Sequence, residues 1–117
     1  MQNDLKVRTK QIGVKVIGLV DLLPHKPSAW VIAKQILWCS TSVGANYRAA
    51  CRAKSPADFI YKLKIVEEET DETIFWFEMM NESRMLPKGE ISEIMKDAND
   101  ILAMVVASIK TMKNKNP

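Results

Sequence analysis

The sequence predicts an all-α fold, an antiparallel up-down-up-down four-helix bundle. Three observations predict it. Apolar residues recur at spacings of three and four along most of the chain, short stretches with proline or glycine interrupt this pattern, and no segment between these breaks alternates as a strand would. A chain of 117 residues has room for one modest core, so we expect a single bundle domain over residues 1–117.

Four helices are expected between the breaks. Pro24 ends the first helix, and Ser28 is well placed to cap the second. The clearest start is that of the third helix, where Ser55 can cap, Pro56 suits the first helical position and Asp58 can return the capping-box hydrogen bond. The predicted helices span about residues 4–23, 29–53, 56–85 and 90–113.

The core stripe of the second predicted helix is made of unusually small residues, with Ser40 and Gly44 in its middle. Glycine costs a helix roughly 1 kcal/mol relative to alanine, so its place in this stripe indicates that a neighbouring helix comes close there. We therefore predict that Ser40 and Gly44 are helix-packing residues, with Gly44 at a contact between two backbones.

The second and third predicted helices are apolar on two sides rather than one. A helix of this kind is usually buried on both sides, and one small bundle can cover only one of them. The second side is therefore expected to contact another copy or another molecule, and contact with another copy predicts a homo-oligomer. The expected oligomer interface comprises Val31, Trp38, Ala45, Ala49, Tyr61, Ile65, Glu69, Glu72 and Trp76.

The formal net charge of +3 conceals an uneven distribution of charge along the chain. No acidic residue lies between Asp21 and Asp58, whereas residues 55–86 contain eight acids and three bases. A basic helix and an acidic helix in one small domain indicate mutual pairing. The expected ion pairs join Glu69 and Glu72 to Lys34, Arg48 or Arg52, within the bundle or across a subunit boundary.

Assembly would also gather the basic residues of several copies into one surface that attracts RNA or DNA. Trp38 is a candidate for stacking on an unpaired base. The opposing hypothesis is a protein-interaction scaffold or accessory subunit that binds no nucleic acid, because +3 is a mild charge and no nucleic-acid motif occurs. The candidate nucleic-acid contacts are Lys34, Arg48, Arg52 and Lys54.

The residue patterns of most catalytic and metal sites are missing from the sequence. An acidic run from Glu67 to Glu72 suggests a di-metal centre, but such centres in bundles also use Glu-x-x-His, and no predicted helix contains histidine. A cysteine nucleophile would need a nearby base, and the sole histidine, His25, lies in a loop. We therefore expect no enzymatic activity, no cofactor, no metal and no small-molecule substrate.

The two cysteines, Cys39 and Cys51, lie about 18 Å apart along one predicted helix and cannot bridge to each other there. The sequence contains no secretory signal and no apolar run long enough to span a bilayer. These observations predict a cytoplasmic protein with reduced thiols and no membrane contact.

Three motifs follow one another along the chain: residues 39–46 (CSTSVGAN), residues 54–59 (KSPADF), and Glu69-x-x-Glu72-Thr73-x-x-Trp76. Together they resemble the bacterial four-helix-bundle proteins first noticed as products of intervening sequences in 23S ribosomal RNA genes. The resemblance covers nearly the whole chain. It implies an antiparallel bundle assembled as a homopentamer, with no established enzymatic activity. Similar bundles serve as accessory proteins of diversity-generating retroelements, where a basic pentameric barrel engages nucleic acid and a reverse transcriptase.

Two positions depart from the pattern of the family that this chain resembles. The family commonly has Arg immediately before the first motif and Glu three residues after its Asn, whereas this chain has Trp38 and Ala49. Both lie on the second side of the second predicted helix. The resemblance therefore implies that an apolar contact replaces a polar one at this surface.

Overall fold

The computed structural model describes residues 2–115 and contains four α-helices, which confirms the predicted all-α class. No strand occurs in this part of the chain. The first residue and the last two residues of the predicted domain lie outside the described range. The helices are α1 (Gln2–Val20), α2 (Pro27–Cys51), α3 (Pro56–Glu82) and α4 (Lys88–Lys115).

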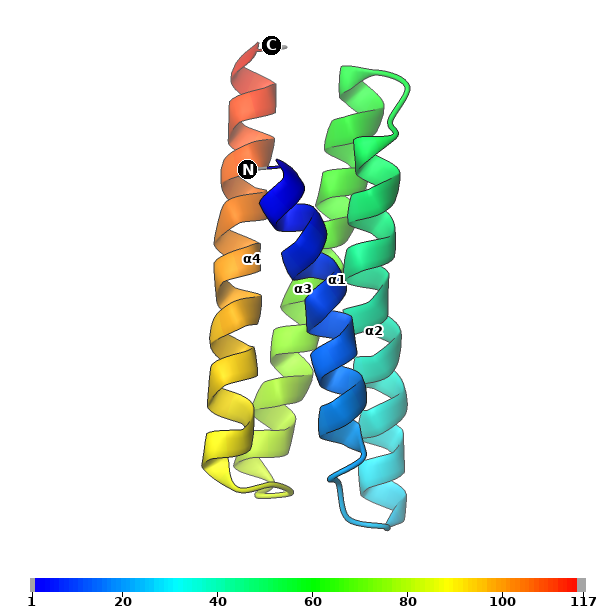
Figure 1. The fold of residues 1–117 in the computed structure, drawn as a ribbon, viewed down its shortest axis with the longest axis vertical. Helices are drawn as coiled ribbons and strands as arrows, with labels where there is room; N and C mark the ends of the chain where they lie inside the picture. Colours follow the sequence, from blue (N-terminus) through cyan, green and yellow to red (C-terminus); the bar gives the residue numbers. More distant parts are fainter. Residues whose placement is uncertain (1, 116–117) are drawn as a thin grey trace.

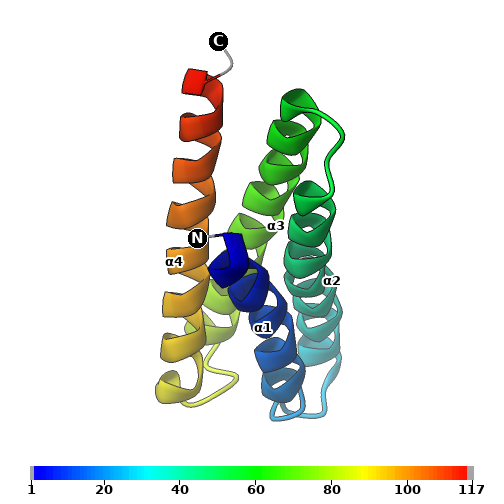
Figure 2. The same cartoon turned by 45° about the horizontal axis from the view of Figure 1, so that its top comes forward.

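Each helix packs against two others, in the cyclic order α1, α2, α3, α4. Figure 1 shows the helices side by side, with the α1–α2 and α3–α4 connections at one end and the α2–α3 connection at the other. The bundle is 48 Å long and 21 by 20 Å across. Because α1 is the shortest helix, the other three extend beyond its first turn (Figures 1 and 2).

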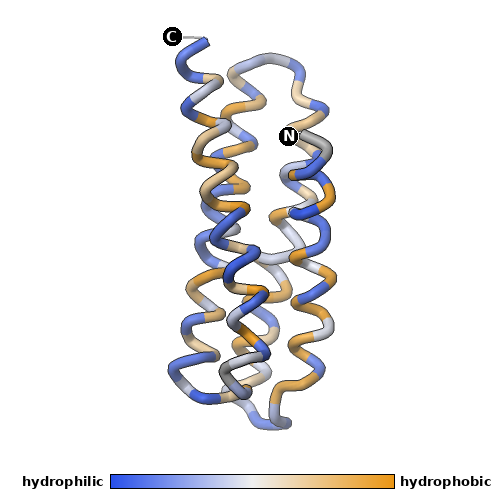
Figure 3. The backbone as a smooth tube through the Cα atoms, turned by 60° about the vertical axis from the view of Figure 1, so that its left-hand side comes forward, coloured by the Kyte–Doolittle hydropathy of each residue, from blue (hydrophilic) through white to orange (hydrophobic). Residues whose placement is uncertain are grey.

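The core runs along the whole bundle and draws on all four helices. Leu5, Ile36, Phe77 and Ile101, one from each helix, are almost completely buried. Apolar and polar positions alternate with the helical period in Figure 3, as expected for helices with one side in a core. Three of the four buried serine and threonine hydroxyl groups bond back to their own helix: Thr9 Oγ1, for example, donates to the Leu5 carbonyl at 2.6 Å. The fourth, Ser40 Oγ, has no hydrogen-bond partner in the described part of the chain.

The helix ends depart from the predicted ones by less than a turn. α1 stops at Val20 instead of residue 23, because Leu22 N–H and Leu23 N–H donate to carbonyl groups three residues back and form a turn before Pro24. The prediction that Ser28 caps α2 is wrong. The cap position belongs to Lys26, whose side chain makes no capping hydrogen bond, and Pro27 occupies the first turn.

The start of α3 follows the predicted chemistry with one shift. Ser55 Oγ accepts a hydrogen bond from Asp58 N–H at 3.1 Å. Asp58 returns a bond to the N–H of Lys54 at 3.3 Å, one residue before the position that a capping box uses. The Asp58 carboxyl accepts hydrogen bonds from Lys54 N–H and from Lys62 Nζ, and these bonds lower its pKa.

The end of α3 lies at Glu82 and not at residue 85, because a Schellman turn terminates the helix there. Met85 N–H donates to the Met80 carbonyl at 3.1 Å, and Arg84 N–H donates to the Asn81 carbonyl at 3.2 Å. Arg84 has the left-handed φ of 57° that this turn requires. Glycine usually holds this position, so apolar periodicity alone did not reveal the stop.

Candidate functional site

The second sides of α2 and α3 form one surface, which we call the α2–α3 face. Inside the bundle, Thr73 Oγ1 of α3 donates to Cys39 Sγ of α2 at 3.3 Å. Trp38 precedes Cys39 and Glu72 precedes Thr73, and both side chains are exposed beside this contact. The α2–α3 face comprises Val31, Trp38, Ala49, Tyr61, Ile65, Glu69, Glu72 and Trp76, which were predicted from sequence, and in addition Phe75 and Met79.

Large aromatic side chains of the α2–α3 face are open to solvent in the single chain. Trp38 is 75% exposed, Tyr61 is 63% exposed and Phe75 is 48% exposed. Phe75 also packs edge-on against Trp76, with ring centroids 5.0 Å apart. Clustered exposed apolar side chains of this size are typical of interaction sites. Phe75 and Met79 were not predicted at the interface, although both keep the helical spacing with Tyr61.

Two buried polar atoms under the α2–α3 face lack a hydrogen-bond partner in the described part of the chain. They are Glu69 Oε2 and Trp76 Nε1. Burial, followed by the nearby charges of Glu72 and Glu68, raises the pKa of Glu69. Leaving a buried polar group unpaired costs about 1–3 kcal/mol. A molecule that covers this face could supply a donor to Glu69 and an acceptor to Trp76.

A second surface, which we call the α1–α2 groove, lies on another side of α2. The two helices come close at Gly44, where a Cβ atom would lie 2.9 Å from the Thr9 carbonyl oxygen and 3.1 Å from the Lys10 Cα. Ser40, one turn earlier, is fully buried. The groove has a volume of about 490 Å³. It is lined by Lys6, Val7, Lys10, Gly44, Ala45, Arg48 and Arg52.

The structure divides the residues that were predicted to contact nucleic acid. Arg48 and Arg52 share the α1–α2 groove. Lys34 lies about 21 Å before Arg48 along the axis of α2, outside this groove. Lys54 follows the end of α2, where its N–H donates to Asp58. Ala45, which was predicted at the oligomer interface, lines the same groove as the two arginines.

The expected ion pairs of Glu69 and Glu72 with Lys34, Arg48 or Arg52 do not form within the chain. Over residues 2–115, no pair joins these groups at 4.0 Å or less. The sequence places the two sets on neighbouring helices. It could not establish that the guanidinium groups face α1 while the carboxylates lie on the side away from α1. Pairing across a subunit boundary stays a prediction.

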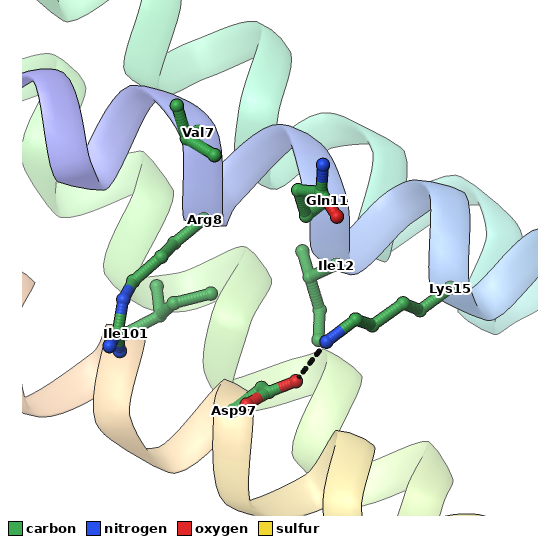
Figure 4. A pocket seen from close by; sticks show the side chains of 7 residues that line it. All are labelled: Val7, Arg8, Gln11, Ile12, Lys15, Asp97 and Ile101. Atoms are coloured by element: carbon green, nitrogen blue, oxygen red, sulfur yellow. Dashed lines mark hydrogen bonds and ion pairs between the residues drawn. The ribbon is translucent and has the colours of Figure 1, made fainter.

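A hollow of about 250 Å³ separates α1 from α4, and Figure 4 shows the side chains that line it. Its cations already have partners. Lys15 Nζ lies 2.6 Å from Asp97 Oδ2, and Arg8 lies within 3.4 Å of Asp4 and 3.9 Å of Asp100. These pairs neutralise the cations of the hollow, which distinguishes it from the α1–α2 groove. The pairs with Asp97 and Asp100 also link α1 to α4.

The sequence matches, over residues 2–107, the family described as 23S rRNA-intervening sequence protein. The chain belongs to this family. Among solved structures, it is similar to a protein with unknown function from the S23 ribosomal protein family of Bacteroides thetaiotaomicron VPI-5482. The two are 33% identical, the alignment covers 93% of this chain and 97% of that chain, and the TM-score is 0.86. A comparison with curated proteins finds no match.

The two positions that depart from the family pattern lie on the α2–α3 face. Trp38 is its most exposed aromatic residue, and Ala49 is half-buried three turns further along α2. The motif residues Glu69, Glu72 and Trp76 lie on the α3 part of the same face. The residues that carry the resemblance therefore gather at this surface as well as in the core.

The buried thiol of Cys39 is not an activated nucleophile. Burial raises the pKa of Cys39 to about 11, with smaller contributions from Glu72 and Glu69, so the thiol stays protonated at neutral pH. In the described range, no group of three or more His, Cys, Asp or Glu side chains could hold a metal ion. None of the described helices is both long and apolar enough to cross a bilayer.

Proposed function

We propose that this chain is a non-enzymatic protein that assembles as a homo-oligomer of antiparallel up-down-up-down bundles through its α2–α3 face. The observation that carries the proposal is the pair of buried, unpartnered atoms, Glu69 Oε2 and Trp76 Nε1, under exposed aromatic side chains. A second copy on this face would remove Trp38 from water and bring polar groups to both atoms. Burial of the aromatic side chains would supply most of the affinity.

The charges of the α2–α3 face favour contact with a different face of the neighbouring copy. Docking the face onto itself would place Glu69 and Glu72 of one copy against the same carboxylates of the other, and like charges in contact cost several kcal/mol. The other large exposed apolar residues near the α1–α2 connection are Val14, Ile17, Leu22 and Trp30. A contact between two different faces generates rings when it closes. A homopentamer, which the family resemblance implies, is such a ring.

A single surface substitution tests the assembly. Trp38→Glu places a charge at the centre of the α2–α3 face, and we expect it to shift the protein to a single-chain mass in size-exclusion chromatography with light scattering. Ala103→Glu is the matched control, because Ala103 is exposed on α4 and the change adds the same charge. An oligomer that survives Trp38→Glu unchanged would place the interface elsewhere.

We further propose that the assembled basic surface binds RNA or DNA. The α1–α2 groove supports this activity, because it combines Lys6 and Lys10 with Arg48 and Arg52 and contains no acid. Binding of a mixed RNA and DNA panel should weaken steeply as salt rises, since cations that contact phosphates release bound counterions. An absence of binding at about 50 mM salt would remove this half of the proposal.

The alternative is a protein-interaction scaffold without nucleic-acid binding, in which basic residues only neutralise the acidic residues of α3 in a neighbouring copy. Charge reversal at Lys34 and Arg52 separates the two. If the oligomer dissociates, these residues belong to the subunit interface. If the oligomer survives and nucleic-acid binding is lost, they belong to the binding surface.

A further inference from the structure

The α1–α2 groove concentrates four cationic side chains on a small apolar floor. Lys6 and Lys10 are four residues apart on α1, so they project from the same side of that helix. Arg48 and Arg52 have the same spacing on α2. The floor between the two pairs is formed by Val7, Gly44 and Ala45. The four charges therefore line two opposite walls of one trough.

The absence of a side chain at Gly44 is what brings these walls together. A Cβ atom at this position would meet backbone atoms of Thr9 and Lys10 at 2.9 and 3.1 Å, so only glycine lets α1 lie this close to α2. Lys10 is itself one of the residues at the contact. The closest approach of the two helices thus lies at the floor of the groove.

None of the four cations has an acidic partner in the described part of the chain. Among residues 2–115, no carboxylate lies within 4.0 Å of Lys6, Lys10, Arg48 or Arg52, whereas Arg8, Lys15 and Lys62 all have acidic partners. Like charges four residues apart on a helix repel each other and destabilise it. An anion in the groove would relieve this repulsion in both helices at once.

The shape of the groove favours a thin polyanion over the acidic surface of another copy. The carboxylates of Glu67, Glu68 and Asp71 line, together with Lys64, a hollow of their own between α3 and α4, and two concave surfaces cannot fill each other. A nucleic-acid strand is narrow, carries one charge per nucleotide and offers phosphate oxygens to the guanidinium forks of two arginines.

We propose that the α1–α2 groove binds the sugar-phosphate backbone of an RNA or DNA strand, with Lys6 and Lys10 on one wall and Arg48 and Arg52 on the other. This inference rests on the proposed nucleic-acid binding and names its site. The four cations contact phosphates, and the floor contains no side chain that could hydrogen-bond a base edge. Binding is therefore independent of sequence.

Paired substitutions test the groove in the full chain. The groove variants are Lys6→Gln with Lys10→Gln, and Arg48→Gln with Arg52→Gln. The control is Lys110→Gln with Lys113→Gln, which removes the same charge from the end of α4. The probe is a fluorescein-labelled mixed-sequence single-stranded RNA of about 20 nucleotides. Its affinity is measured by fluorescence anisotropy from about 50 to 200 mM salt, and light scattering of each variant records the oligomer mass.

Each groove variant should lose on the order of tenfold in affinity at about 100 mM salt, and the slope of log K against log salt should fall by about 1.4. The control should keep the slope of the wild type. Groove variants that bind with the unchanged slope would overturn the groove while leaving nucleic-acid binding in place. Wild-type protein that binds no RNA would instead overturn the proposed function. Groove variants that fall apart into single chains would show that another copy occupies the groove, which also overturns the inference.

Discussion

At the scale of single residues, Gly44 decides how α1 and α2 fit together. Most core positions tolerate some change of volume, because a neighbouring side chain can move. At Gly44 the nearest atoms belong to the backbone of Thr9 and Lys10, which cannot move without displacing α1. The predicted contact between backbones at this residue corresponds to the shortest distances found around any glycine of the described chain.

Gly44→Ala should destabilise the protein by about 1–3 kcal/mol, because the cost of overpacking exceeds the helix propensity gained. Gly18→Ala is the control: nothing lies within 4 Å of its added Cβ, so the same change should stabilise α1 by about 0.5–1 kcal/mol. Urea unfolding followed by circular dichroism measures both. Equal stabilisation by the two substitutions would contradict the close approach.

Glu69 is a second residue with a testable environment. Burial and the neighbouring Glu72 and Glu68 raise its pKa above the ordinary 4.5, so the folded chain holds this proton more tightly than the unfolded chain does. The contribution of Glu69 to stability is therefore most favourable below pH 4.5 and falls as the pH rises through the raised pKa.

Glu69→Gln should remove this loss of stability at higher pH, so the single-chain variant should be more stable than its parent at pH 7. The measurement is urea unfolding between about pH 4 and pH 8 in the Trp38→Glu background, where a single chain is expected. Glu78→Gln is the matched control, because it removes a carboxylate from the exposed side of α3. This variant should show the same change of stability with pH as its Trp38→Glu parent. A Glu69→Gln chain that is less stable at pH 7 would mean that the carboxylate has a partner.

At the scale of helices, periodicity and turn chemistry predicted the four elements, while details of their ends depended on backbone geometry. Ser55 caps α3, yet Ser28, with the same chemistry, does not cap α2, because the helix starts one residue before it at Pro27. The rotation of one helix about its axis relative to its neighbour is also not encoded in spacing alone. For that reason the sequence did not predict that Lys6 and Lys10 of α1 share a groove with Arg48 and Arg52 of α2.

The two serines make a matched pair for stability measurements. Ser55→Ala should cost about 1 kcal/mol, because the N–H of Asp58 loses its acceptor. Ser28→Ala removes no capping bond and should change stability by less than about 0.5 kcal/mol. Thermal unfolding at one fixed protein concentration compares them. A larger loss for Ser28→Ala than for Ser55→Ala would contradict the observed helix starts.

At the scale of the whole molecule, the faces around α2 have opposite chemical character. The α1–α2 groove is basic, and the α2–α3 face combines aromatic side chains with Glu69 and Glu72. The sequence predicted most residues of the second face, because two apolar sides on one helix leave a clear signal. It could not place Phe75 there, since a phenylalanine on a helix is more often a core residue.

The native mass in solution tests the central claim most directly, because an isolated chain would leave Trp38 in water and Glu69 without a donor. Multi-angle light scattering at micromolar concentration should give a constant integer multiple of the single-chain mass, with tryptophan fluorescence largely protected from acrylamide quenching. A single-chain mass, accompanied by free quenching of the indoles, would contradict the account.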